Sequence, residues 1–403
     1  MQFIKRWFLG VFAVALFLFT CTTKDGKIMG FSSHTGNLMV SSVNYYGARI
    51  FLDYRDTGQV TPALLQNVPV GEHIVHVFLS KTRSTPDSAI VVVEEGKEAS
   101  VQFELVKVSS GDLKISTEPD SARVYVNKLH FGVTPLQIVG LPEGDYRVEI
   151  ARSNYLPVKE TVSVGSNQIA EIHKSLTRVK VALLEHFSNV SCPPCPQSDA
   201  VIEDLSRHYG PVLLIPVEYH PFFPSNTDPM YRAAEAENRA RYNFYQPKNI
   251  PAAYVNGVKV DDPLSEESYR EKIRTALQET PVAEIAFTDV SLSDSSLSGK
   301  LQVRAIQDLP ANTVLMIVLV EDAVDYDTPP GTNGQTHFEY VMRSMYPDAN
   351  GTAVQLTAGQ RESFTFQFTP SPEWGHDLSV VAFLQVTDTR QVLQSAWTHY
   401  PEF

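Results

Sequence analysis

The chain has 403 residues, and at about 150 residues per domain this length predicts about three domains. Apolar residues make up 43% and charged residues 20%, which is typical of folded domains and excludes a disordered chain. The net charge of −13 argues against nucleic acid as a partner, because such proteins need basic surface. Neither G-x-x-x-x-G-K-[ST] nor G-x-G-x-x-G occurs, so nucleotide binding lacks its usual sequence support.

Residues 1–20 are predicted to be an export signal. Lys5 and Arg6 precede a short apolar run, 7–19, which is below the roughly 20 residues that a membrane span needs. The run ends in Leu-Phe-Thr-Cys, which resembles a bacterial lipobox and implies a lipoprotein whose N-terminal Cys21 carries lipid. A signal peptide followed by a stray cysteine is the alternative. The polar segment 21–35 is expected to be a tether between this anchor and the folded part.

Two segments repeat one pattern of short strands and turns. The matching stretches are 47–53 with 121–127, 61–62 with 134–135, and 68–75 with 141–148. Alternating apolar strands joined by Pro-x-Gly turns predict two small antiparallel β-sandwich modules. The turn Pro142-Glu143-Gly144 and the preceding Thr-Pro pair make residues 109–177 resemble the PEGA domain, with 36–108 as a degenerate copy. The resemblance implies no catalytic motif, and both a spacer and contacts with envelope glycans or proteins remain open.

Another pattern begins at residue 178. A continuously apolar strand, 179–184, leads into Cys192-Pro-Pro-Cys195 and then into a helix-like segment. A second apolar strand, an insertion with a helix over 231–245, Ile250-Pro251, an Asn-Gly hairpin and a final helix over 265–279 follow. This order of elements around a C-x-x-C pair makes residues 178–280 resemble the α/β thioredoxin fold.

Residues 183–196 more specifically resemble the outer-membrane protein 28 family of Gram-negative lipoproteins. This resemblance implies a β-rich C-terminal domain after the thioredoxin-like one. It also implies that Pro251 is the family's cis-proline and that Ile250 and Pro251 bind an extended substrate beside the cysteines. His186 falls where thioredoxins keep a buried acid, and Glu185 precedes it. Either side chain could move a proton, but only one can face the cysteines, since neighbouring strand residues point oppositely. His186 is favoured because its ordinary pKa suits proton transfer near neutral pH.

The cysteine pair itself predicts thiol–disulfide exchange. Cys192 at a helix N-terminus is favoured as the attacking thiolate, and Cys195 would resolve the mixed disulfide. The prolines at 193, 194 and 196 lack N–H donors, which favours a reductant or general exchange protein over a strong oxidant. A structural disulfide is the alternative, although a four-residue loop gains little stability from closure. No second C-x-x-C or spaced histidine pair occurs, so neither a metal site nor a cofactor beyond the disulfide is predicted.

Residues 281–403 are expected to form a separate Ig-like β-sandwich of about seven strands. Residues 363–368 alternate between aromatic and polar side chains, and 314–320 and 378–386 are strongly apolar. Four acidic residues, Glu321, Asp322, Asp325 and Asp327, are expected in one solvated loop, because their spacing matches no calcium-binding loop.

The sequence therefore predicts a multidomain, lipid-anchored protein of a Gram-negative cell envelope, held at the outer membrane. The predicted activity is thiol–disulfide exchange on exported proteins through Cys192 and Cys195. The alternative is a surface adhesin or scaffold whose thioredoxin-like domain has lost its activity. The three β domains favour the alternative, and the intact cysteine pair favours the enzyme.

Overall fold

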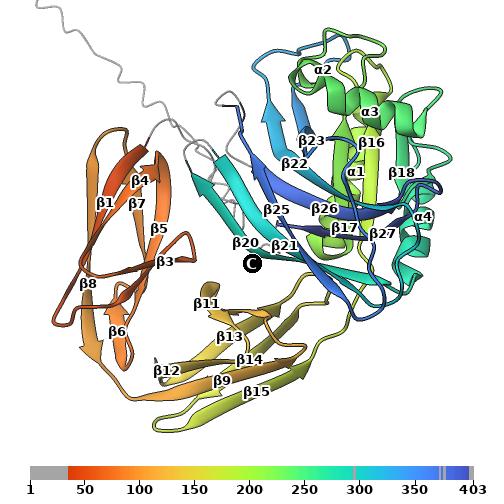
Figure 1. Ribbon diagram of the computed structural model, residues 1–403. Coiled ribbons are helices and arrows are strands. Elements are labelled where there is room, and N and C mark those ends of the chain that lie inside the picture. The colour runs from red at the N-terminus through yellow and green to blue at the C-terminus, as the bar shows by residue number, and fades with distance from the viewer. Residues whose placement is uncertain (1–34, 294–295, 372–373, 375–377, 399–403) are drawn as a thin grey trace, which may run out of the picture.

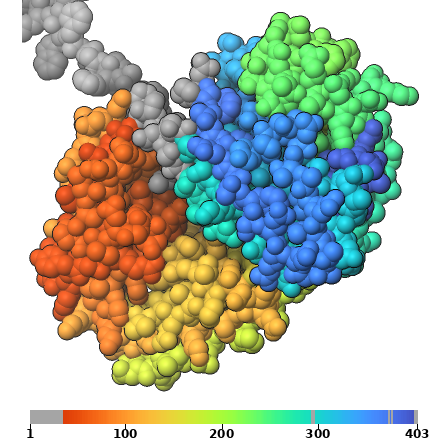
Figure 2. All heavy atoms as spheres, viewed as in Figure 1, coloured from red at the N-terminus to blue at the C-terminus, as the bar shows by residue number. Residues whose placement is uncertain are grey.

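The computed structural model describes residues 35–293, 296–371, 374 and 378–398. Two small β modules and a larger unit follow one another along an arc, with the second module at the bend (Figures 1 and 2). The predicted export signal, Cys21 and nearly all of the tether lie outside the described residues. Among the described helices, none has the length and apolar character needed to cross a membrane.

The first module is a sandwich of two four-stranded sheets, ordered β4–β1–β8–β6 and β3–β2–β5–β7. Alternate residues of β1 are buried, and Leu38 and Val40 pack with Phe103 in the core. Its strands are β1 (Thr35–Val43), β2 (Arg49–Leu52), β3 (Arg55–Val60), β4 (Ala63–Pro69), β5 (Gly71–Phe78), β6 (Thr82–Thr85), β7 (Ala89–Val93) and β8 (Glu98–Lys107).

The second module repeats this arrangement with sheets ordered β12–β9–β15 and β11–β10–β13–β14. In each module the first strand pairs in parallel with the last one, β1 with β8 and β9 with β15. Its strands are β9 (Ser110–Glu118), β10 (Arg123–Val126), β11 (Leu129–Val133), β12 (Leu136–Pro142), β13 (Gly144–Ala151), β14 (Val158–Val164) and β15 (Ile169–Ser175).

A buried hydroxyl pair also occurs at the same place in both modules. Thr61 Oγ1 lies 2.6 Å from Ser42 Oγ, and Thr134 Oγ1 lies 2.6 Å from Thr117 Oγ1. Thr61 and Thr134 each precede the proline of a repeated Thr-Pro pair. The repeat in the sequence is therefore a repeat in three dimensions, down to the polar contact inside each sandwich.

The larger unit is built on one nine-stranded sheet, ordered β19–β18–β16–β17–β23–β22–β26–β27 with β24 beside β22. We expected the residues after 281 to form a domain of their own. Instead, β23 pairs in parallel with β17 through Val341 and Glu218, so C-terminal strands extend the sheet that carries the cysteines. These strands are β16 (Ala182–Phe187), β17 (Leu214–Tyr219), β18 (Ala252–Val255), β19 (Val258–Lys259), β22 (Thr313–Asp325), β23 (His337–Tyr346), β24 (Thr352–Ala353), β26 (Leu378–Val386) and β27 (Val392–Trp397).

A second sheet, β20–β21–β25, completes a sandwich over the C-terminal part of the first one. Its strands are β20 (Ala283–Ser293), β21 (Ser296–Ala305) and β25 (Arg361–Phe368). The core between the sheets includes Ile285, Leu301, Leu319 and Ala382. The β-rich sandwich expected here is thus present, but one of its two layers is shared.

Four helices cover the remaining faces of the long sheet: α1 (Cys195–Leu213), α2 (Pro229–Ala233), α3 (Glu235–Tyr245) and α4 (Glu266–Gln278). Helices α1 and α4 pack on the face that includes Ala182 and Leu184, through Leu205 and Ile273. Tyr245 at the end of α3 packs on the opposite face. The single insertion helix expected over 231–245 is divided into α2 and α3 at Ala234.

The predicted solvated acidic loop needs correction. Glu321 and Asp322 lie inside β22 and are buried, and each carboxylate has a polar partner. Arg343 Nε donates to Glu321 Oε2 at 2.5 Å, and Ser379 Oγ donates to Asp322 Oδ1 at 2.5 Å. Buried carboxylates are tolerated only when they are paired in this way. Three of the four acidic residues are therefore strand residues, and the loop begins after Asp325.

Candidate functional site

The cysteine pair lies where β16 turns into α1. Cys192 and Cys195 form a disulfide, and Cys195 is the first residue of the helix. The backbone N–H of Cys195 donates to the Cys192 carbonyl at 3.2 Å, which closes the turn. Cys192 is only 2% exposed and Cys195 is fully buried, whereas Pro193 and Pro194 between them are exposed. The prolines are thus the accessible part of the motif.

A loop from the C-terminal strands packs against the segment that precedes Cys192. In this loop, residues 326–336, the Asn333 N–H donates to the Val190 carbonyl at 3.0 Å. The Asn333 side-chain amide donates to the Asn189 carbonyl at 3.3 Å. Gly331 lies so close to Val190 that a Cβ atom there would collide with the Val190 carbonyl. No local pattern in the sequence indicates this packing, because the contact joins residues more than 140 positions apart.

The two candidate proton-moving residues face opposite sides of the sheet, as strand alternation requires. Glu185 is fully buried beneath α3, where Arg241 Nη2 and the Tyr245 hydroxyl both donate to its carboxylate. His186 lies on the α1 face, where its Nε2 is 3.0 Å from Ser198 Oγ. Only His186 therefore shares a side of the sheet with the helix that carries Cys195.

Ile250 and Pro251 lie at the same end of the sheet. Their peptide bond is cis, and both residues are half-buried. Strand β18 begins at Ala252, which pairs with Phe187 at the end of β16. The predicted substrate-binding pair thus directly precedes the strand that flanks the approach to Cys192.

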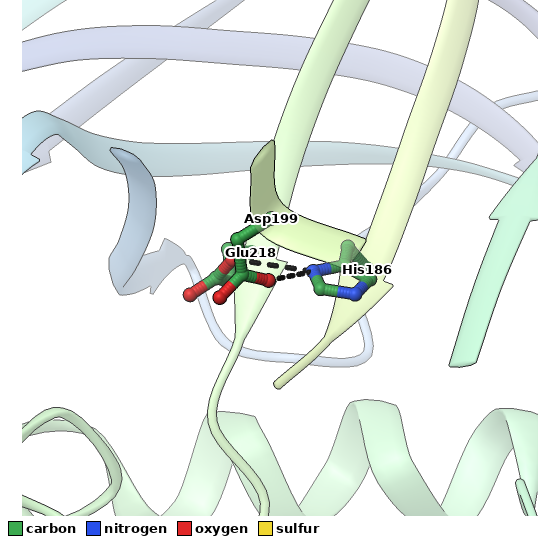
Figure 3. A group of neighbouring side chains, drawn as sticks. All are labelled: His186, Asp199 and Glu218. Carbon is green, nitrogen blue, oxygen red and sulfur yellow. Dashed lines mark hydrogen bonds and ion pairs between the residues drawn. The ribbon is translucent and has the colours of Figure 1, made fainter. Parts of the chain in front are cut away.

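His186 belongs to a buried polar cluster that the sequence analysis missed. Its Nδ1 lies 3.2 Å from Glu218 Oε2 and 3.4 Å from Asp199 Oδ1 (Figure 3). His220 extends the cluster, with Nε2 2.8 Å from Glu218 Oε1 and Nδ1 2.9 Å from Asp228 Oδ2. Glu218 lies near the end of β17, which runs parallel to β16, and His220 follows that strand directly; such strand ends bring polar side chains together. The position of these two polar residues at the end of an apolar strand was the sequence signal that could have revealed the cluster.

Burial and mutual charge shift the ionisation of this cluster strongly. Burial, reinforced by the charge of Glu218, raises the pKa of Asp199 to about 7. Burial opposes ionisation of Glu218, but hydrogen bonds and charges from His186 and His220 prevail and lower its pKa to about 2. Burial likewise opposes the charged form of His220, yet Asp228 and Glu218 raise its pKa to about 10. The cluster therefore combines ionised groups in a nearly dry site.

Asp228 connects this cluster to the segment before the cysteines. Its Oδ2 accepts the Val190 N–H at 3.0 Å, and its Oδ1 accepts the Met230 N–H at 2.8 Å at the start of α2. The side chain of Asn238 in α3 accepts the His220 N–H at 2.8 Å. The inserted helices therefore position the end of β17 and, through Asp228, the chain before Cys192.

Comparisons with known proteins give partial matches. No curated protein sequence matches the chain. The structure of HBP35 of Porphyromonas gingivalis is 14% identical, with a TM-score of 0.45, and the match covers 54% of this chain and 74% of that one. A domain of the outer membrane lipoprotein Omp28 from Porphyromonas gingivalis is 13% identical, with a TM-score of 0.21, over 30% of this chain and 88% of that one.

The minor pilin GBS52 of Streptococcus agalactiae also matches, with 11% identity and a TM-score of 0.15 over 36% of this chain and 97% of that one. The family match is confined to the second β module, and it agrees with the resemblance carried by the Pro142-Glu143-Gly144 turn. Residues 110–180 of the chain match the model of the PEGA domain family.

Proposed function

We propose that the chain is an envelope protein that exchanges thiols and disulfides with other exported proteins through Cys192 and Cys195. The observation that carries the proposal is the position of the disulfide at the start of α1, directly after β16. Strand β16 pairs in parallel with β17 and antiparallel with β18, and β18 pairs antiparallel with β19. This order supports a thioredoxin-like arrangement of residues 178–280.

In the reducing direction, the Cys192 thiolate attacks one sulfur of a substrate disulfide and displaces the other sulfur as a thiolate. The product is a mixed disulfide between Cys192 and the substrate. The Cys195 thiolate then attacks the Cys192 sulfur, which re-forms the Cys192–Cys195 disulfide and releases the second substrate thiolate. Two electrons pass from the protein to the substrate, and an external dithiol reductant must restore the pair.

The location follows from the lipobox-like end of the apolar run. Lipid on Cys21 would hold the chain at the outer membrane of a Gram-negative cell, and the two β modules would carry the cysteine pair away from the membrane. The modules could also contact envelope glycans or proteins. Labelling with radioactive palmitate, compared between the wild type and Cys21→Ser, tests the anchor.

The reduction potential of the pair tests the activity. The chain has three cysteines, so the Cys21→Ser variant leaves only Cys192 and Cys195 to titrate. Equilibration against glutathione or dithiothreitol buffers, followed by alkylation, should give a potential between about −200 and −280 mV. The prolines around the cysteines remove N–H donors to the thiolate, which places the expected value nearer to thioredoxin than to a strong oxidant.

Trapping identifies which cysteine attacks. In Cys195→Ser the mixed disulfide cannot be resolved, so this variant should retain substrate proteins covalently, whereas Cys192→Ser should retain none. A value close to −120 mV would refute the reductant, and equal trapping by both variants would refute the assigned roles.

The second candidate is a surface adhesin or scaffold in which the disulfide is structural. The 2% exposure of Cys192, together with the two β modules, favours it. A potential below about −300 mV would make this the better description, because structural disulfides resist reduction by thiol buffers.

A further inference from the structure

Three side chains direct one polar atom each toward a common point beside α1. They are His186 Nδ1, Asp199 Oδ1 and Glu218 Oε2, and Figure 3 shows the side chains converging. His186 and Glu218 are direct neighbours in the parallel pair β16–β17, and Asp199 comes from α1 above them. All three therefore sit on regular elements, which hold side-chain positions more precisely than loops do.

Each of the three residues has a second polar atom, which points away from the common point and contacts a neighbouring side chain. Two of these contacts are hydrogen bonds, His186 Nε2 with Ser198 Oγ at 3.0 Å and Gln335 Nε2 to Asp199 Oδ2 at 2.7 Å, and the third is the ion pair of Glu218 Oε1 with His220 Nε2 at 2.8 Å. His220 is in turn fixed by Asp228. Outer contacts of this kind orient the ligands of metal sites, where a coordinating histidine bonds through its second nitrogen.

The inward atoms are not satisfied by one another. His186 Nδ1 can carry one proton and thus donate one hydrogen bond, which the structure directs to Glu218 Oε2. Asp199 Oδ1 is buried and has no hydrogen-bond partner among the described residues. A buried carboxylate oxygen without a partner is costly, and a cation between the three atoms would remove that cost.

The two spacings that involve His186 match those between ligands of a single ion. Zinc binds nitrogen and carboxylate oxygen at about 2.0–2.2 Å, so two of its ligands in a tetrahedral site lie about 3.4 Å apart. The distances from His186 Nδ1 to the two oxygens are 3.2 and 3.4 Å, and all three atoms lie within 4.8 Å of one another. Mixed nitrogen and oxygen ligands suit Zn²⁺ better than Mg²⁺, which prefers oxygen alone.

We propose that His186, Asp199 and Glu218 form a Zn²⁺-binding site beside the first turns of α1. This site goes beyond the proposed thiol exchange and does not depend on it. His220, Ser198 and Gln335 are positioning residues, since each contacts a ligand and none is counted as a ligand itself.

Calorimetric titration of the full-length chain with ZnCl₂ tests the site, with the disulfide kept oxidised so that thiolates do not bind metal. The wild type should bind one Zn²⁺ per chain, confirmed by metal analysis after dialysis, and the same titration with MgCl₂ should give no saturable heat. Glu218→Gln should weaken Zn²⁺ binding at least about tenfold. The control is Glu203→Gln. Glu203 lies in α1, the helix that carries the ligand Asp199, but outside the cluster, so this variant should bind Zn²⁺ like the wild type.

A second variant guards against misfolding of Glu218→Gln. Gln335→Ala removes the contact with Asp199 and the hydrogen bond from Asn333 Nδ2 to Gln335 Oε1, both at the loop 326–336 and outside the core of the sheet, so it should fold normally and still weaken Zn²⁺ binding by about tenfold. The site is refuted if the wild type binds no Zn²⁺, which would leave an ion-paired cluster alone. Unchanged affinity in both Glu218→Gln and Gln335→Ala would also refute it, because the metal would then bind elsewhere.

Discussion

Replacing Arg241 with alanine should lower the free energy of unfolding by about 3–5 kcal/mol, the range found when one partner of a buried ion pair is removed. Arg241 lies in α3 and is only 2% exposed. Its Nη2 donates to the fully buried carboxylate of Glu185, and its Nη1 donates to Gln385 Oε1 at 3.1 Å. Without the guanidinium, Glu185 would remain as a buried charge that keeps the hydrogen bond from the Tyr245 hydroxyl but has lost its ion-pair partner.

Aromatic packing adds to the effect. The Arg241 guanidinium lies 4.8 Å from the ring centre of Phe244 and 5.2 Å from that of Tyr245. Cation–π contacts of this kind contribute more when water is excluded. The same side chain therefore connects α3 to β16 by charge and to its own helix by aromatic contact, so alanine removes both at once.

Urea denaturation followed by tryptophan fluorescence measures the change, since Trp397 is buried in β27 of the same sheet. Arg207→Ala is the matched control: this arginine pairs with Glu203 one turn away but is 63% exposed, so the loss should stay below about 1 kcal/mol. Glu185→Gln in the Arg241→Ala background should recover part of the stability, because the isolated charge is then gone. A loss below 1 kcal/mol for Arg241→Ala would contradict the assignment of this pair as a buried anchor.

Local sequence patterns predicted the elements around the cysteines, because each pattern reflects a local cause. The run 179–184 is apolar because β16 is buried on both faces, and Asn256-Gly257 forms the β18–β19 turn because both residues adopt positive φ. The duplicated Thr-Pro and Pro-x-Gly segments likewise appear as two sandwiches of one design. In all these cases the information lies within a few residues of the element itself.

Pairings between distant segments were not predictable in the same way. The join between β17 and β23 rests on a single register pair, Glu218 with Val341, and no local pattern marks it. Glu321 and Asp322 look solvated in sequence, and only their contacts with Arg343 and Ser379 explain their burial. The cluster around His186 escaped for the same reason, since Asp199 and Glu218 come from separate elements. Whether a polar residue in a strand is buried therefore depends on its partners in distant segments, and a single sequence does not reveal those partners.

The junction between the second β module and the larger unit depends on another buried carboxylate, Glu284 in β20. The Tyr155 hydroxyl donates to its Oε1 at 2.5 Å, and Arg178 Nε donates to the same oxygen at 2.7 Å. Arg304 lies 3.7 Å from its Oε2. Tyr155 belongs to the module and Glu284 to the sandwich, so this cluster joins the two parts.

Glu284→Gln should lower the free energy of unfolding by about 2–3 kcal/mol at pH 7, because it removes charge-assisted hydrogen bonds at a buried position. Burial alone would raise the pKa of Glu284, but hydrogen bonds from Tyr155 and Arg178 and the charges of Arg178 and Arg304 outweigh it and lower the pKa. A carboxyl whose pKa is lowered by folding stabilises the protein above its unfolded pKa, about 4.3 for glutamate. That contribution is lost as the pH falls through the lower, folded value.

Urea titrations of wild type and Glu284→Gln at pH 7, 5, 4 and 3 measure this dependence. The difference between the two proteins should be constant from pH 7 to 5 and should shrink below about pH 4.3, since the protonated wild-type side chain then resembles the amide. Glu171→Gln, at an exposed position in the second β module, should show little difference at any of these values. A gap that persisted at pH 3 would mean that Glu284 acts through its shape and packing, and that its charge does not hold the module in place.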